Sequence, residues 1–286
     1  MHVLNLFKYY ATKYKGEDNL SFYSEGSIYF QKPIKFNDPW DCELPQISIP
    51  RQKKTLKKFW LDLGKRKAPD FVKTEWQNIR NLPRTEIKRR VEELFKVALE
   101  RLRSRIGVFS LSFIPDSELM WSHYASSHFG YMLHFQIDIA HYKADSSLMN
   151  VGIPIPVIYR DKMEVWNLAN YETNRLRHYY DLVRFKSNAW AYECELRLLN
   201  TDKFGFIKTP GNWLKSIVIG INTDSELRDK LEDIGNTLKV SVLSSKMNKK
   251  EYKIDIPGLK INGNDGRTCY KDVINSKEFN LDHLEK

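Results

Sequence analysis

Residues 107–137, GVFSLSFIPDSELMWSHYASSHFGYMLHFQI, decide the expected fold. GVFSLSF (107–113) alternates apolar and small polar residues, which is typical of a strand, and GYMLHFQI (130–137) is a second strand-like run. DSELMWSHYASS (116–127) lies between them and is interpreted as a short helix. The stretch therefore predicts a strand, a short helix and a second strand.

Further strand-like runs lie on both sides of this stretch. They are LNLFKYY (4–10), GSIYFQKP (26–33), IPIPVIYR (153–160), NAWAYECELRLLN (188–200), LKSIVIGI (214–221), TLKVSVLSS (237–245) and EYKIDIP (251–257). The prolines of 153–160 cannot donate to a ladder, which predicts an edge strand. Helices are expected over 162–185 and after the capping box TDSE at 223–226. We therefore expect an α+β fold with a mixed, mainly antiparallel sheet and a helical basic insertion.

The segment 51–105 is the expected insertion. It holds 18 Lys or Arg residues against seven Asp or Glu, an excess of +11, whereas the whole chain carries +10. Its apolar residues between Ile87 and Ile106 step mostly by three and four, which predicts an amphipathic helix with charged faces outward. A charge excess confined to one segment favours a nucleic-acid partner. The alternative is a solvated, lysine-rich surface.

Composition limits the class of protein. We expect residues 1–258 to form a single domain that contains the insertion, and residues 259–286 to form a polar, poorly ordered tail. No apolar run is long enough to span a membrane, and the N-terminus lacks the continuous apolar stretch of a signal peptide. Three widely spaced cysteines suit a reducing compartment. A cytoplasmic protein without membrane contact is expected.

Three motifs combine aromatic and titratable residues in a way that core packing does not require. They are FNDPWD (36–41), MWSHYASSHFG (120–130) and KSNAWAYECELR (186–197). On a strand, Glu193, Glu195 and Arg197 of the third motif share one face. Such charges are costly on a central strand unless they pair or bind something. They form either a carboxylate beside a cation at the floor of a cleft, or an exposed strand face with a Glu–Arg ion pair.

The second motif contains two histidines. His123 and His128 are five residues apart and do not share a helix face. No third residue lies at a spacing typical of zinc ligands, so no metal site is expected. His123 is either a histidine that hydrogen-bonds a neighbouring loop or a catalytic or ligand-orienting residue next to Tyr124.

The first motif has a local explanation, because Asn37, Asp38 and Pro39 are turn-forming residues. Asp38 and Asp41 could still bind a divalent ion. Together with Glu195 they leave a metal-dependent nuclease as an alternative. Such a nuclease core would need a Glu-x-Lys triplet on a strand close behind the Asp, and neither of the two Glu-x-Lys triplets in the chain has that position. The chain also lacks the GxxxxGKS, GxGxxG, GxSxG and HExxH motifs, which removes support from P-loop hydrolases, Rossmann oxidoreductases and serine hydrolases.

The three motifs, in this order, resemble a widespread bacterial family of domains of unknown function, family 2971. LFKYY (6–10), YFQKPIKFNDPWD (29–41), LMWSHYASSHFGYMLHF (119–135) and the pattern K-x3-W-x-YE-x-E-x-R carry the resemblance, which runs from about residue 6 to residue 220. The basic segment 51–105 falls where such proteins vary. The resemblance implies no particular chemistry.

The layout is also similar to that of ADP-ribosyltransferase-like domains, in which an early strand carries a basic or polar residue, the next an aromatic residue or Ser, and a late strand a catalytic Glu. Lys8 with Tyr9, then Tyr29, then Glu193 and Glu195 occupy these places. The resemblance implies NAD as a cofactor and Glu195 as the main catalytic residue, with Glu193 orienting the acceptor. The remaining candidates are His123 for catalysis and Asn37, Asp38, Tyr124 and Arg197 for cofactor binding.

We therefore expect an ADP-ribosyltransferase-like enzyme that acts on a nucleic acid or a nucleic-acid-associated target, an activity that would fit a toxin or an anti-phage effector. The expected nucleic-acid contacts are Lys57, Lys58, Arg89 and Arg90, which lie off the apolar stripes. The alternatives are a non-enzymatic nucleic-acid-binding module and the metal-dependent nuclease. Convergence of Lys8, Tyr29, His123 and Glu195 on one cleft would favour the enzyme.

Overall fold

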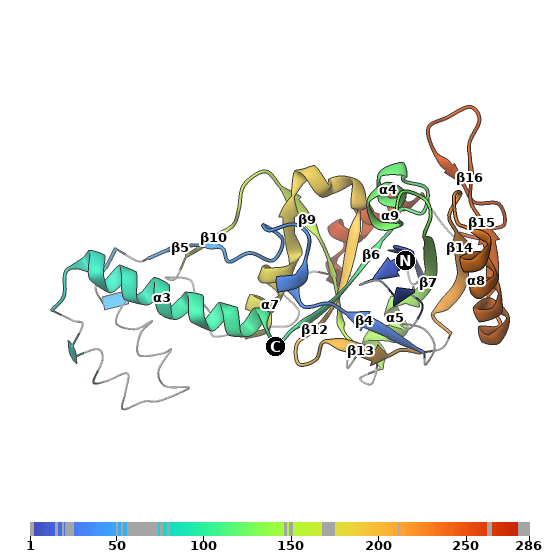
Figure 1. Cartoon of the computed structure of the whole chain (residues 1–286). Helices are drawn as coiled ribbons and strands as arrows, with labels where there is room; N and C mark the ends of the chain where they lie inside the picture. Colours follow the sequence, from blue (N-terminus) through green and yellow to red (C-terminus); the bar gives the residue numbers. More distant parts are fainter. Residues whose placement is uncertain are drawn as a thin grey trace.

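A seven-stranded sheet forms the centre of the molecule (Figure 1). The computed structural model describes residues 3–14, 17–18, 20, 26–49, 51–52, 54–55, 74, 77–78, 81–145, 148, 151–167, 175–210, 212–261 and 265–279. The sheet has the order β15-β14-β7-β1-β6-β12-β8. Its strands are β1 (Val3–Tyr10), β6 (Gly107–Ser112), β7 (Tyr131–Asp138), β8 (Ile153–Pro156), β12 (Glu195–Asn200), β14 (Leu214–Ile219) and β15 (Ser241–Ser244).

All neighbouring strands of this sheet are antiparallel except β14 and β15, which are parallel. The expected α+β class with a mixed, mainly antiparallel sheet is therefore confirmed. The proline-containing strand β8 lies at one edge, as its sequence predicts.

Smaller elements surround the sheet. Two-stranded sheets pair β2 (Lys13–Tyr14) with β3 (Glu17–Asp18), β4 (Ser27–Phe30) with β13 (Gly205–Lys208), β5 (Gln46–Ser48) with β10 (Val165–Asn167), β9 (Ile158–Arg160) with β11 (Phe185–Ser187), and β16 (Lys246–Met247) with β17 (Ile254–Asp255). The helices are α3 (Arg84–Arg103), α4 (Glu118–Tyr124), α5 (Ile139–Ala144), α7 (Arg175–Arg184), α8 (Ser225–Leu238) and α9 (Gly266–Asn275), with 3-10 turns η1 (Pro33–Lys35), η3 (Asn188–Glu193) and η4 (Lys277–Phe279). None of the described helices is long and apolar enough to cross a bilayer.

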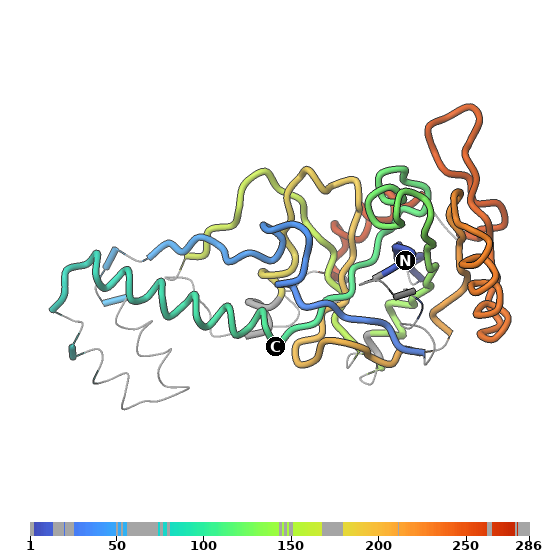
Figure 2. The backbone as a smooth tube through the Cα atoms, in the orientation of Figure 1, coloured from blue at the N-terminus to red at the C-terminus, as the bar shows by residue number. Residues whose placement is uncertain are grey.

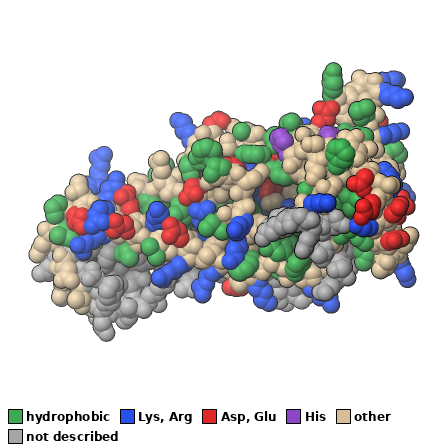
Figure 3. Space-filling model, viewed as in Figure 1, with side chains coloured by type: hydrophobic (Ala, Val, Ile, Leu, Met, Phe, Trp, Pro, Cys, Tyr) green, Lys and Arg blue, Asp and Glu red, His purple; other side chains and the backbone are tan. Residues whose placement is uncertain are grey.

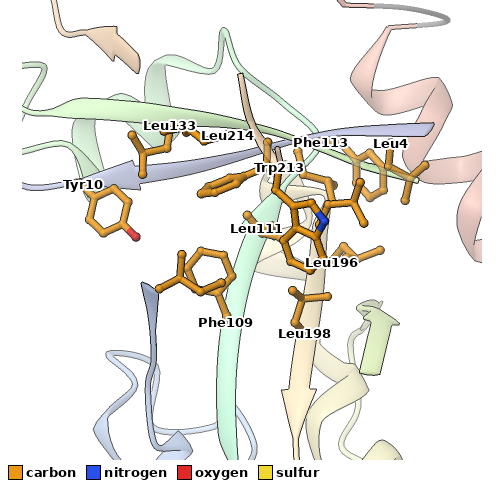
Figure 4. Close-up of a cluster of buried hydrophobic side chains, with 14 of the residues drawn as sticks. Leu4, Tyr10, Phe109, Leu111, Phe113, Leu133, Leu196, Leu198, Trp213 and Leu214 are labelled. Carbon is orange, nitrogen blue, oxygen red and sulfur yellow. The ribbon is translucent and has the colours of Figure 1, made fainter. Parts of the chain in front are cut away.

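The sheet is packed on both faces. On one face, Leu4, Phe109, Leu133 and Leu196 from four different strands meet in a buried cluster that Trp213 also joins (Figure 4). On the other face, residues of β1 and β7 pack against α4, whose Trp121 is fully buried. Alternate residues of the same strands thus face two separate cores, which fixes the register of the sheet.

Helix α3 projects from the sheet as an arm (Figures 1 and 2). It buries one stripe, Ile87, Val91, Phe95 and Leu99, against the β5–β10 pair, and Phe95 meets Trp166 edge-on at 6.2 Å between ring centroids. The predicted amphipathic helix is confirmed, although the buried stripe is narrower than expected because Leu94 and Ala98 are exposed. The arm also includes β5 and β10, which lie outside residues 51–105.

Three expectations are wrong in part. Of the described residues between 162 and 185, those of α7 are helical, whereas residues 165–167 pair with β5 as strand β10. Residues 188–193 form a 3-10 turn instead of the start of a strand. Part of the expected polar tail forms helix α9, because Tyr270 and Val273 pack into the main core and the Tyr270 hydroxyl donates to the Val157 carbonyl at 2.5 Å.

Candidate functional site

A cleft opens in the sheet where β1 and β6 separate. Within the described residues these two strands pair at Phe7 and Ser112, whereas β1 pairs with β7 along its whole length. The cleft has a volume of about 590 Å³, within the range of small-molecule sites. The separating halves of both strands line it, with Lys8, Tyr9 and Tyr10 on β1 and Val108, Ser110 and Leu111 on β6.

All three sequence motifs reach this cleft. FNDPWD contributes Asn37 and Asp41, MWSHYASSHFG contributes His123 and Tyr124 on α4, and the third motif contributes Lys186, Glu193 and Glu195. The structure thus brings together side chains that are more than 150 positions apart in the chain.

Arg197 anchors a buried charge cluster beneath the cleft. Its guanidinium donates to Asp41 at 2.8 and 2.6 Å and to Glu195 at 2.8 and 3.0 Å, and also to the Val183 carbonyl at 2.8 Å. Arg197 is 0% exposed, and its bidentate pairing with two carboxylates offsets the free-energy cost of burying its charge.

Lys186 is the second cation of the cluster. Its Nζ lies 2.6 Å from Glu193 Oε2, 3.3 Å from Glu195 Oε2 and 3.4 Å from Asp41 Oδ2. Burial opposes its charge, but the carboxylates of Glu195 and Asp41 raise the pKa of Lys186 above its ordinary value. Lys186 therefore links the three carboxylates as a permanent cation.

The two glutamates have different environments. Burial alone would raise the pKa of Glu195, but Arg197 and Lys186 hold it well below its usual range. Burial, together with the charge of Glu195, raises the pKa of Glu193. Glu193 accepts from Lys186 and, at 2.5 Å, from the Tyr124 hydroxyl. The pKa of Glu195 is thus lowered, whereas that of Glu193 is raised.

The turn before β12 determines where the two glutamates point. Glu193 ends η3, and Cys194 follows with φ 43° and ψ 63°, a left-handed conformation that turns the chain into the strand. The Ser112 hydroxyl donates to the Glu193 carbonyl at 2.6 Å and fixes the turn. The prediction that Glu193 shares a strand face with Glu195 and Arg197 is therefore wrong for Glu193, although it holds for the other two.

Lys8 is another cation that lines the cleft. It is partly buried, and its Nζ lies 5.3 Å from the centroid of the Phe109 ring. Burial lowers the pKa of Lys8 to about 8, and Glu195 and Glu193 offset only part of that effect. No carboxylate of the described residues lies within ion-pair distance of Lys8. Its charge is therefore available to an anionic group in the cleft.

Two aromatic groups flank the cleft. Tyr29 of β4 and Phe206 of β13 meet edge-on, 5.1 Å apart, and are 40% and 55% exposed. On the α4 side, His123 lies next to Tyr124, and its Nδ1 is 2.8 Å from the Tyr192 hydroxyl. Exposed rings on two sides of a cleft can hold planar groups of a ligand.

Most of the predicted site residues lie along this cleft. They are Lys8, Tyr9, Tyr29, Asn37, His123, Tyr124, Glu193 and Glu195. The Tyr9 hydroxyl is engaged by the Ile114 carbonyl at 2.6 Å. Arg197 lies behind the cleft in the charge cluster, and Asp38 is buried in its turn, where Oδ1 accepts from the Trp40 amide.

The predicted nucleic-acid contacts lie elsewhere. Lys57 and Lys58 fall outside the described residues. Arg89 is exposed on α3 and pairs with Glu86 and Glu93, and Arg90 also pairs with Glu86. The ion pairs of this helix reduce its available positive charge.

Sequence reasoning missed Lys186 as a site residue. The signal was present, since Lys186 begins the K-x3-W-x-YE-x-E-x-R pattern. The sequence suggests Asp41 only as a metal ligand, but in the structure its carboxylate forms ion pairs with Arg197 and Lys186. Among the residues that the structure describes, no three His, Cys, Asp or Glu side chains are grouped as metal ligands would be.

Comparison with known families finds one match, to part of the chain. Residues 120–198 match the family described as protein of unknown function, DUF2971. This segment is therefore similar to the DUF2971 family. The DUF2971 segment begins on α4, ends within β12 and includes the motifs that supply Tyr124, Lys186 and Glu193. No curated protein and no solved structure was found to be similar to the chain.

Proposed function

We propose that this protein is an ADP-ribosyltransferase-like enzyme that binds NAD in the cleft between β1 and β6 and transfers the ADP-ribosyl group to an acceptor. The observation that carries the proposal is the meeting of Lys8, Tyr29 and the Glu193–Glu195 pair along one cleft. These are the residues that the layout of such enzymes would place together.

The lining suits a dinucleotide. NAD has two ring systems joined by a pyrophosphate, and the cleft has two aromatic flanks with Lys8 among its lining residues. Stacking on Tyr29 and Phe206 or beside His123 would hold the rings, and Lys8 would attract the phosphates. A volume of about 590 Å³ accommodates a ligand of this class.

Glu193 is the carboxyl group best placed for the reaction. Breaking the bond between the ribose C1′ and nicotinamide leaves positive charge on the sugar, which a nearby carboxylate stabilises. Nicotinamide departs with the bonding electrons, and the acceptor oxygen forms the new bond to C1′. Glu193 takes the proton of the acceptor, a role that suits a carboxyl group with a raised pKa.

Glu195 then has a positioning role. Both of its oxygens accept hydrogen bonds from Arg197, and Lys186 lies against one of them, so it holds these cations beside Glu193. This assignment reverses the roles expected from sequence, in which Glu195 was the main catalytic residue.

The acceptor is proposed to be a nucleic acid or a nucleic-acid-associated target. The support is the charge excess of residues 51–105, within which α3 projects from the sheet (Figure 1). Contacts of this kind would be made to phosphates and would carry little sequence preference.

Release of nicotinamide from NAD tests the proposal. The wild-type protein should release nicotinamide, and Glu193→Gln should lower the rate at least about 100-fold, because general acid–base catalysis contributes roughly 10²–10⁴-fold. Glu118→Gln is the matched control, since Glu118 is exposed on α4 and does not line the cleft. A wild-type protein that does not release nicotinamide, or a Glu193→Gln variant with the full rate, would contradict the proposal.

A further inference from the structure

The hairpin formed by β16 and β17 projects from the end of the molecule opposite the α3 arm (Figure 1). It presents two large apolar side chains to solvent, since Tyr252 is 97% exposed and Met247 is 71% exposed. Tyr252 therefore makes little contact with its own chain, and its ring is accessible to a partner.

Lysines surround this tyrosine. Residues 246–253 contain Lys246, Lys249, Lys250 and Lys253 against a single acidic residue, Glu251. Glu251 pairs with Lys253 at 2.7 Å, while the consecutive residues Lys249 and Lys250 are exposed in the turn. Basic and apolar side chains gather together at this projection in the space-filling view (Figure 3).

The hairpin is also held in one shape. The Asn248 side-chain oxygen accepts from the amides of Lys250 and Glu251, both at 2.8 Å, and its nitrogen donates to Asp255 at 3.0 and 3.1 Å. At the base, Ile254 is buried in the same core as Trp121 of α4. Tyr252 is therefore presented from a fixed turn, which lowers the entropic cost of binding a partner.

We propose that this hairpin binds single-stranded nucleic acid, with Tyr252 stacking on a base and Lys249 and Lys250 contacting the adjacent phosphates. An exposed ring between cations matches the alternation of bases and phosphates along a single strand. In a duplex the bases are already stacked, and the ring has no free base to cover. The site is separate from both the cleft and the segment 51–105.

Fluorescence anisotropy with a short labelled oligothymidylate at low salt tests this proposal with the full chain. Tyr252→Ala should weaken binding about tenfold or more, because base–aromatic stacks are worth that much by alanine substitution. Tyr252→Phe is the matched control and should bind within about twofold of wild type, since it keeps the stacking face. Lys249→Glu with Lys250→Glu should weaken binding and reduce its salt dependence.

Two results would overturn the proposal. One is wild-type protein that does not bind the oligothymidylate, or that binds a duplex of the same length equally well. The other is Tyr252→Ala protein with wild-type affinity, which would place any binding elsewhere on the chain, as on residues 51–105. Because Tyr252 is almost fully exposed, its replacement should leave the melting temperature unchanged, and a thermal melt confirms that the variant is folded.

Discussion

Arg197 is the residue on which the charge cluster depends. It is 0% exposed and neutralises Asp41 and Glu195, both of which are buried. Arg197→Met should lower the free energy of unfolding by about 3–5 kcal/mol, because two buried carboxylates lose their bidentate partner and keep only Lys186 as a nearby cation. Urea denaturation measures the loss.

Arg89→Met provides the comparison for that change. Arg89 also pairs with two glutamates, but it is exposed on α3, where solvent screens its ion pairs. We expect its replacement to change the unfolding midpoint little. Equal stability of the two variants would mean that the buried cluster does not stabilise the fold.

Tyr124 controls the proton on Glu193. Its hydroxyl donates to the Glu193 carboxyl group at 2.5 Å, a contact that favours the ionised form and lowers the pKa. Tyr124→Phe should therefore raise the pKa of Glu193 further and move the acid limb of the pH–rate profile for nicotinamide release to higher pH. Tyr192→Phe should leave that limb in place, because the Tyr192 hydroxyl contacts His123. A shift toward lower pH in Tyr124→Phe would contradict this assignment.

At the scale of elements, the sequence predicts the features of helices and strands that depend on residue spacing and on proline. The buried stripe of α3 and the edge position of β8 follow from apolar spacing and from proline. The 3-10 turn η3 was not predicted, because NAWAYE is as compatible with a strand as with a tight turn. The left-handed Cys194 that ends this turn is held by tertiary contacts, and no glycine marks the position.

The basic segment gives a prediction at the same scale. Lys57→Glu and Lys58→Glu combined with Arg89→Gln and Arg90→Gln should weaken nucleic-acid binding by orders of magnitude and reduce the slope of affinity against salt. Glutamine is chosen on α3 because a glutamate at 89 would repel Glu86 and Glu93. Electrophoretic mobility shifts across a salt series provide the measurement.

Arg228→Glu with Lys230→Glu is the control for that experiment, since both residues lie on α8, away from the arm (Figure 1). Binding that the four substitutions leave unchanged would show that the excess charge of 51–105 is only a solvated surface.

At the scale of the whole molecule, the sequence identified the three motifs but not the geometry that joins them. Motifs mark residue types, whereas the meeting of Asp41 with Arg197 depends on a contact 156 positions apart in the chain. The separation of β1 from β6 is likewise set by packing of the assembled sheet. For this reason the cleft could be hypothesised from sequence, while the different environments of Glu193 and Glu195 could not.

The acid stability of the fold should depend on His134. This histidine is buried between Asn5 and Ser216, and burial lowers its pKa from 6.5 to about 4. Between pH 6.5 and pH 4 the unfolded chain therefore binds a proton at His134 that the folded state does not bind. The free energy of unfolding falls as the pH is lowered through this range. The expected loss is roughly 1.4 kcal/mol per pH unit.

The difference between wild type and His134→Gln isolates this effect from other titrating groups. Denaturation at pH 6.5 and pH 4.5 is sufficient, because the paired carboxylate of Glu195 contributes mainly below this window. The variant should lose less stability on acidification than the wild type. An equal loss in both proteins would exclude His134 as the cause.

The central claim is that the cleft between β1 and β6 binds NAD, and calorimetric titration of NAD tests it most directly. Phe206 and Phe204 are a matched pair, since both are partly exposed and lie two positions apart, but only Phe206 is among the described residues that line the cleft. We predict that NAD binds to the wild type, that Phe206→Ala weakens binding about tenfold through loss of an aromatic contact, and that Phe204→Ala binds like the wild type. Absence of NAD binding, or equal affinity in the two variants, would contradict the account.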